Sequence, residues 1–291
     1  MNRSRIPWLV NADGSPGYTW SPTTGCGPGL PCYERCWARA YHVRYRGGDF
    51  SVKLHPSKLD EPLRLRKPST IGVCLMGDLF HEDVPLDFLT KIAVTMERAV
   101  NARGHRFLVL TKRPDRMADW LQGVGERPPE GIWWGVSVED QATADARIPI
   151  LLDTPAAHRW VSLEPQVGAV DLTGWLRTFY SGDWGAPPGT IRSGAREKKL
   201  DLVIQGCESG PRRRPFSAQW ARDVRDQCKE ARVPFALKQM AIGGRIMERP
   251  GLDDDPAWNL PWAPLPAPMR LKSQAELVGE WYGSGLRKGE G

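Results

Sequence analysis

Short apolar runs that alternate with helical segments are the feature of this 291-residue sequence that most limits its fold. The runs are continuously apolar, which is typical of strands that are buried on both faces of a parallel sheet. A short extended stretch at Tyr18–Trp20, in an irregular start rich in Gly and Pro, precedes them. We predict strands at Thr70–Leu75, Phe107–Thr111, Ile132–Val138, Arg159–Leu163, Leu202–Gln205 and Pro234–Lys238.

Helical segments fill the intervals between these runs. Leu86–Val100 has apolar residues at helical spacing, and Ser217 is a predicted N-cap of a later helix. Cys228 lies on the inner face of that helix as a small core residue. Six or seven β-α units in series predict an α/β fold, a complete or partial (β/α) barrel of six to seven parallel strands. A doubly wound open sheet is the competing topology.

One domain is expected over residues 1–249, with an inserted loop at Ser181–Lys199 that is rich in Gly, Ser and charge. Residues 250–291 are rich in Pro and Trp and predict an irregular tail that packs on the domain. No apolar run reaches the roughly 20 residues that span a bilayer, and the N-terminus has no apolar stretch of signal-peptide length. We therefore expect a soluble, cytoplasmic protein with no membrane partner.

Three of the six cysteines, Cys26, Cys32 and Cys36, lie within eleven residues. In a cytoplasmic chain, such clustering favours metal binding over disulfides. Thiolates select zinc, copper(I) or iron–sulfur clusters, and a structural zinc site normally needs a fourth ligand. A 4Fe-4S cluster with three cysteines instead leaves one iron open to S-adenosylmethionine. The cluster is favoured, with zinc as the alternative.

Several segments, taken in order, resemble the phage-associated three-cysteine proteins, a family of unknown function usually described as radical S-adenosylmethionine-like. The resemblance covers about Thr19 to Arg245 and implies a radical S-adenosylmethionine-like barrel, a 4Fe-4S cluster and S-adenosylmethionine. If the protein is phage-encoded, the resemblance implies that it is located in the host cytoplasm. The matching segments are Thr19–Cys26, Met76–Val84, Leu108–Pro114, Trp134–Glu139, Trp160–Pro165, Gln205–Pro215 and Val233–Gln239.

The sequence departs from the family pattern at two places. Cys32 and Cys36 are separated by three residues, where the family commonly has two. Cys207 stands where the family more often has Gly. It is either a fourth thiolate ligand or, in the interpretation we favour, a small residue at a tight turn.

Ligand-binding groups in such barrels lie at the carboxyl ends of the strands, where the matching segments fall. By the resemblance, Gly77 and Asp78 would hold the amino group of S-adenosylmethionine, although a turn before a helix is the plainer interpretation. Small polar residues with carboxylates at three strand ends predict a polar ring around a cavity. The three pairs of this ring are Ser137 with Glu139, Ser162 with Glu164, and Glu208 with Ser209. The predicted cofactor-binding residues are Gly77, Asp78, Lys112, Ser137, Glu139 and Glu164.

A second predicted group faces the substrate. A guanidinium suits a carboxylate or a phosphate, and Arg212–Arg214 follow a strand end, where the alternative is a solvated basic loop. His81 and Glu82 could reach the site or begin a helix. The predicted substrate-binding residues are Arg113, Glu208, Arg212, Arg213 and Lys238.

The net charge of +6 fits a phosphate-bearing partner, although it also fits an ordinary basic enzyme. With the predicted cluster, the basic rim, the abundant aromatic residues and the phage association that the resemblance implies, we predict a radical enzyme that modifies or repairs a nucleic-acid base, flipped out or single-stranded. The alternatives are a non-catalytic zinc or iron–sulfur nucleic-acid-binding module and a radical enzyme that acts on a small molecule or peptide.

Overall fold

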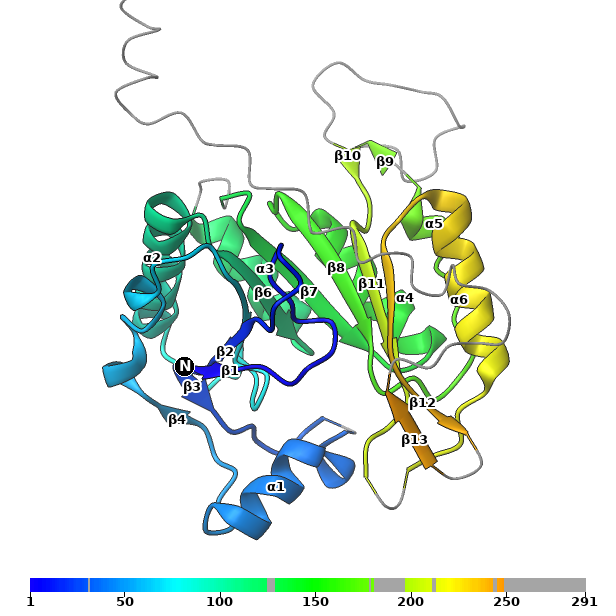
Figure 1. Cartoon of the computed structure of the whole chain (residues 1–291), viewed down its shortest axis with the longest axis horizontal. Coiled ribbons are helices and arrows are strands. Elements are labelled where there is room, and N and C mark those ends of the chain that lie inside the picture. The colour runs from blue at the N-terminus through cyan, green and yellow to red at the C-terminus, as the bar shows by residue number, and fades with distance from the viewer. Residues whose placement is uncertain are drawn as a thin grey trace, which may run out of the picture.

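A nine-stranded sheet forms the centre of the computed structural model, which describes residues 1–30, 32–124, 129–177, 179–180, 197–210, 213–242 and 245–248 (Figure 1). The seven central strands are parallel and lie side by side in chain order. They are β2 (Tyr18–Trp20), β5 (Thr70–Val73), β6 (Arg106–Thr111), β7 (Ile132–Val138), β8 (His158–Leu163), β11 (Leu202–Gly206) and β12 (Phe235–Ile242).

The strand order confirms seven parallel strands and excludes one of the two predicted topologies. A doubly wound sheet reverses its strand order at a switch point, and this sheet does not, so the doubly wound alternative is wrong. The short strands β1 (Asn2–Arg3) and β13 (Arg245–Glu248) pair antiparallel with β2 and β12 at the two edges. Among the described residues no pairing joins these edges, so a closed barrel is not observed.

Two short antiparallel pairs stand beside the large sheet. β3 (Thr23–Thr24) pairs with β4 (Lys53–Leu54), and the segment between them contains the three clustered cysteines. β9 (Phe179–Tyr180) pairs with β10 (Glu197–Lys198) at the ends of the predicted insertion. Residues 181–196 of that insertion and the predicted tail at 250–291 lie outside the described residues. The 3-10 helices are η1 (Tyr33–Arg35), η2 (Pro56–Lys58) and η3 (Pro62–Arg64).

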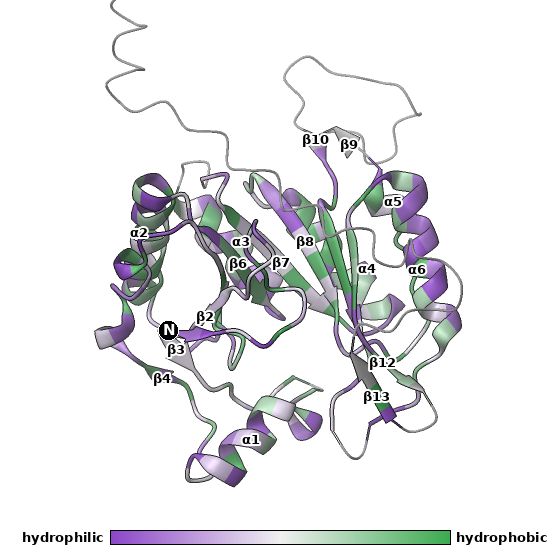
Figure 2. Ribbon diagram, viewed as in Figure 1, coloured by the Kyte–Doolittle hydropathy of each residue, from purple (hydrophilic) through white to green (hydrophobic). Residues whose placement is uncertain are grey.

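Helices cover one face of the sheet. Each crossover moves to the next strand in one direction, and right-handed crossovers then place successive helices on the same side. The main core lies there, between mostly hydrophobic strands and helices that also carry hydrophilic residues (Figure 2). Ser217 caps α6 and Cys228 is fully buried, as predicted. These helices are α2 (Leu86–Arg103), α3 (Pro114–Val124), α4 (Gln141–Asp153), α5 (Thr173–Leu176) and α6 (Ala218–Ala231).

The N-terminal segment packs against side chains that point away from the helices. Trp8 and Leu9 are buried there, and the rings of Trp8 and Trp160 have centroids 5.6 Å apart. This second core explains why the strands are apolar on both faces. Its strand residues are Leu108, Trp133, Trp160, Leu202 and Ile204. Among the described residues, no helix combines the length and the hydrophobicity that crossing a bilayer requires.

Gly135 gives the indole of Trp160 its space in this second core. A Cβ at Gly135 would lie 2.5 Å from Cε2 and Nε1 of Trp160, which is fully buried. We expect Gly135→Ala to lower the free energy of unfolding by about 1–3 kcal/mol, because the packed indole must shift. Urea unfolding followed by circular dichroism measures the loss.

Gly123→Ala is the matched control for this prediction. Gly123 lies in α3 with open space around it, so alanine is expected to raise the free energy of unfolding by up to about 1 kcal/mol. Equal effects of the two substitutions would contradict the packing argument.

Candidate functional site

A cavity of about 190 Å³ lies at the carboxyl ends of the parallel strands and contains all three clustered cysteines in its wall. Part of the wall is apolar, from Ile6, Trp8 and Leu110. The structure therefore brings together most of the residues predicted from strand ends. Those that line this cavity are Cys26, Cys32, Cys36, Gly77, Asp78, Lys112, Ser137, Ser162, Glu164 and Lys238.

A second cavity, of about 120 Å³, adjoins the first. Both cavities are lined by Cys32, Cys36, Lys112, Glu164 and Lys238, so they are compartments of one site. The second one adds the remaining predicted strand-end pair and two further groups. These residues are Cys207, Glu208, Ser209 and Arg214.

The predicted arginine run is only partly placed in this site. Arg214 donates to Glu208 through Nη2 at 3.0 Å and through its backbone N–H at 2.7 Å. Arg213 donates to the Gly210 carbonyl, and Arg212 lies outside the described residues. Arg214 is thus the member of the run that reaches the second cavity.

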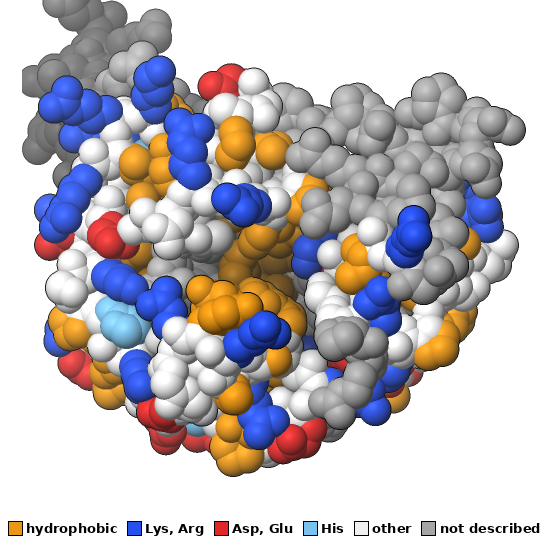
Figure 3. All heavy atoms as spheres, turned by 60° about the horizontal axis from the view of Figure 1, so that its bottom comes forward, with side chains coloured by type: hydrophobic (Ala, Val, Ile, Leu, Met, Phe, Trp, Pro, Cys, Tyr) orange, Lys and Arg blue, Asp and Glu red, His pale blue; other side chains and the backbone are white. Residues whose placement is uncertain are grey.

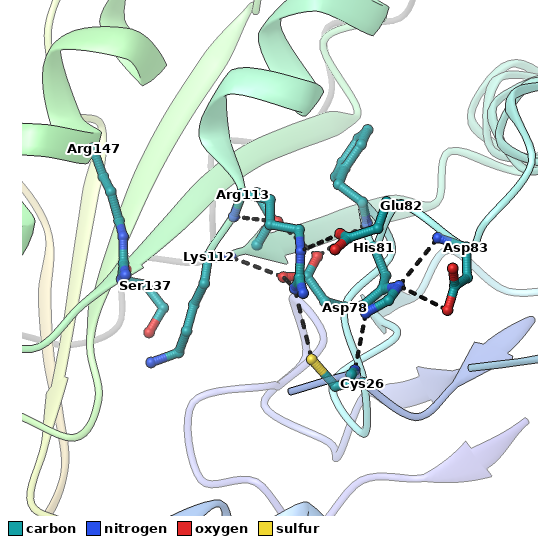
Figure 4. A network of polar contacts seen from close by, with 12 residues as sticks. Cys26, Asp78, His81, Glu82, Asp83, Lys112, Arg113, Ser137 and Arg147 are labelled. Atoms are coloured by element: carbon teal, nitrogen blue, oxygen red, sulfur yellow. Dashed lines mark hydrogen bonds and ion pairs between the residues drawn. The ribbon is translucent and has the colours of Figure 1, made fainter. Parts of the chain in front are cut away.

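Asp78 is the centre of the polar network beside the first cavity (Figure 4). Its Oδ1 accepts from the Phe80 N–H at 3.0 Å and the Thr111 hydroxyl at 2.7 Å. Its Oδ2 accepts from the Lys112 N–H and from Arg113 Nη1, both at 3.1 Å. A carboxylate has about four lone-pair sites, so this buried group is fully used within the protein. Asp78 therefore ties the ends of two strands together.

Gly77 is required by contact between two chain segments. A Cβ there would lie 2.5 Å from the Gly25 carbonyl oxygen, and the two glycines form an isolated parallel bridge. Gly25 itself has a φ of 89°, and a Cβ on it would lie 1.9 Å from the Ser51 carbonyl oxygen. The next residue, Cys26, donates its N–H to Phe50 at 2.8 Å. These contacts fix the first cysteine against the end of β5.

Arg113 connects the acidic network to the first cysteine. Its Nη1 lies 3.1 Å from Asp78 Oδ2 and 3.6 Å from Cys26 Sγ, while Nε donates to Glu82 Oε2 at 3.1 Å. Burial raises the pKa of the Cys26 thiol, whereas the hydrogen bond and positive charge of Arg113 oppose that rise. Arg113 therefore faces Cys26, and its contact with a substrate remains a prediction.

His81 holds the loop that follows Cys26. The Gly27 N–H donates to His81 Nε2 at 2.9 Å, and a Cβ at Gly27 would lie 2.5 Å from the same atom. The ring is buried and precedes α2 by several residues, so His81 does not begin a helix. Figure 4 shows it between Cys26 and Asp83.

Two carboxylates of the predicted polar ring are each paired with a lysine. Lys112 contacts Glu139, and Lys238 Nζ lies 2.6 Å from Glu164 Oε1. The second pair crosses β11, where Gly206 leaves room: a Cβ there would lie 2.9 Å from Glu164 Oε1. Both pairs are largely buried, with side-chain exposures of 11–22%. The ring thus presents both signs of charge.

The other three cysteines differ from the clustered ones in exposure. Cys26, Cys32 and Cys36 are half-buried, whereas the other three are buried, and all six are free thiols. Cys207 lines the second cavity and pairs through its backbone with Gln239. That placement is compatible with the small-residue interpretation.

We expect iodoacetamide at pH 8 to label the three clustered cysteines of the metal-free native protein well before Cys74 and Cys228. Alkylation requires the thiolate, and burial raises the pKa of Cys74 to about 11 and that of Cys228 well above its usual value. Peptide mass mapping over time measures the order. Denatured protein, in which all six should react alike, is the control, and early labelling of Cys228 would contradict the prediction.

The chemistry of the donor set is compatible with an iron–sulfur cluster. Among the described residues, no three His, Cys, Asp or Glu side chains converge closely enough to hold one metal ion. Three half-buried thiols face one cavity, and a 4Fe-4S cluster offers each thiolate a separate iron. The soft donors and the partly apolar wall suit that group.

Comparison with known proteins gives one positive result. No curated protein and no solved structure matches the chain. One family model, described as a protein of unknown function (DUF5131), matches residues 3–251 and so covers both cavities and the strands around them. The chain therefore belongs to the DUF5131 family of proteins of unknown function.

Proposed function

We propose that this chain is an iron–sulfur enzyme that uses a 4Fe-4S cluster and S-adenosylmethionine for radical chemistry on a nucleic-acid base. The observation that carries the proposal is the meeting of Cys26, Cys32 and Cys36 in one cavity at the carboxyl ends of parallel strands. When bound, the cluster would supply the electron that cleaves the sulfonium of S-adenosylmethionine. The in-order sheet supports a partial, radical S-adenosylmethionine-like barrel.

The residues of the cavity would have separate tasks. The three thiolates would hold the cluster, and Arg113, bound to Asp78, would fix the position of Cys26. A methionine group is a zwitterion, and the paired lysines and carboxylates of the polar ring offer partners for its carboxylate and its amino group. The apolar wall around Trp8 would keep water from the reacting atoms.

A nucleic-acid substrate is supported by charge. The chain has a net charge of +6, and arginines lie at the rim of the second cavity. Phosphates bind to such groups through charge-assisted hydrogen bonds. The base would then enter through the second cavity and reach the first cavity at Cys32 and Cys36, which line both.

Anaerobic reconstitution with iron and sulfide tests the proposal. We expect about four irons and four sulfides per chain, a brown colour, and 5′-deoxyadenosine after reduction with dithionite in the presence of S-adenosylmethionine. Zinc as the only metal would overturn it. A bound cluster without formation of 5′-deoxyadenosine would overturn the proposed enzymatic activity and favour a non-catalytic binding module.

A further inference from the structure

An exposed aromatic stripe runs along α1 (Trp37–Tyr45), the helix that begins directly after Cys36. Trp37, Tyr41 and Tyr45 are spaced four residues apart, which places them on one helix face. They are 50%, 39% and 62% exposed, and the two tyrosine rings have centroids 5.2 Å apart. Ala38 is the only residue of this helix that is buried, so packing does not account for the aromatic residues.

The stripe forms one wall of a surface groove of about 720 Å³. The opposite wall is the loop after β11, at Glu208, Ser209 and Gly210. Cys36 and Trp37 line this groove and also both cavities, so the groove leads to the cysteines. Figure 3 shows the side of the molecule where α1 lies, with a hollow bordered by hydrophobic side chains and with Lys and Arg around it.

The charges of the groove favour an anionic occupant. Its carboxylates are neutralised, because Glu34 pairs with Arg39 at 2.8 Å and Glu208 pairs with Arg214 at 3.0 Å. Arg44 also lines the groove, has no acidic partner among the described residues, and lies 5.3 Å from the ring centroid of Tyr45. The unneutralised charge of the wall is therefore positive.

We propose that this groove binds single-stranded nucleic acid, with bases stacked on Trp37, Tyr41 and Tyr45 and phosphates beside Arg44. Stacking on exposed rings within a positively charged groove is the physical basis of single-strand binding. The inference deepens the proposed function and rests on it, because the groove would deliver one base to the cysteine cavity. DNA and RNA share this chemistry.

Fluorescence anisotropy with the full anaerobic chain tests the groove. The probes are fluorescein-labelled oligothymidine and oligouridine of about 12 nucleotides, and a duplex of the same length. We expect salt-dependent binding of a single strand in preference to the duplex. Tyr41→Ala and Tyr45→Ala are each expected to weaken it about tenfold. Arg44→Gln should reduce the slope of log Kd against log salt by about 0.7.

Two controls make the result specific to the groove. Tyr41→Phe keeps the ring and should bind like wild type. Arg98→Gln removes an equal charge from the exposed side of α2 and should leave the affinity and the salt slope nearly unchanged. Preference for the duplex, equal effects of Arg44→Gln and Arg98→Gln, or wild-type affinity of both tyrosine-to-alanine variants would overturn the proposal.

Binding and chemistry can fail separately. Because anisotropy needs no reductant, binding is measured apart from cofactor cleavage. A chain that forms 5′-deoxyadenosine but binds no oligonucleotide overturns the groove and leaves the radical chemistry standing. A chain that binds single strands through the tyrosines without cofactor cleavage supports the groove and overturns the enzyme.

Discussion

Replacing Cys26, Cys32 or Cys36 with Ala is expected to abolish both the cluster and the formation of 5′-deoxyadenosine. Each of these thiols faces the first cavity, and a three-cysteine cluster has no spare thiolate to replace a lost one. Iron and sulfide per chain should fall from about four to well below one. Metal and sulfide analysis after anaerobic reconstitution measures the loss, together with chromatography of the nucleoside product.

Cys207→Ala and Cys228→Ala are the controls for this series. Cys228 lies in the helix-side core, so its variant should bind as much iron as wild type. Cys207 lines the second cavity, and a full iron content in its variant would support the small-residue interpretation. Full iron content in a Cys26→Ala or Cys36→Ala variant would contradict the assigned ligands.

Asp78→Ala is expected to lower the free energy of unfolding by about 3–5 kcal/mol, because it leaves a buried guanidinium without its buried carboxylate partner. The side chains of Asp78 and Arg113 are 7% and 12% exposed, so water does not replace the lost pair. Three further donors, including the Thr111 hydroxyl, also lose their acceptor. Urea unfolding of the metal-free protein measures the change without any contribution from a cluster.

Glu82→Ala is a matched control, since it removes the other carboxylate from Arg113. Glu82 is 69% exposed, so its loss should cost no more than about 1 kcal/mol. If both variants lost the same stability, the buried network around Asp78 would not be the source of the effect.

The sequence predicted the sheet well because strands buried on both faces read as continuous apolar runs. Ile132–Val138 was predicted with the bounds that the structure has. β12 extends beyond its predicted end at Lys238, because residues 239–242 pair with β13 after the polar strand end. Apolar patterning does not specify which strands are neighbours, so the sequence leaves the order of strands in the sheet open.

The sequence predicts where the site lies in the fold, but it predicts few of the contacts between the site residues. The strand-end rule predicts Lys112, Glu164 and Lys238 around a cavity, and all three line the first cavity, while the ligands predicted for them stay predictions. The role of Asp78 as the acceptor for S-adenosylmethionine stays a prediction, and the structure gives its carboxylate four protein donors. The contact between His81 and Gly27 joins residues far apart in the chain, and no sequence pattern indicates that the two are neighbours.

The second core has a consequence for the order in which the chain can fold during synthesis. Trp8 and Leu9 leave the ribosome long before their partners Leu202 and Ile204 are made. Leu108, Trp133 and Trp160 of the same core are made earlier, but contacts between distant segments form slowly, and the two apolar residues stay partly uncovered until β11 has been made. A truncated chain that ends before β11 is therefore expected to expose apolar surface at Trp8 and Leu9 and to require chaperones, although most of its sheet is already present.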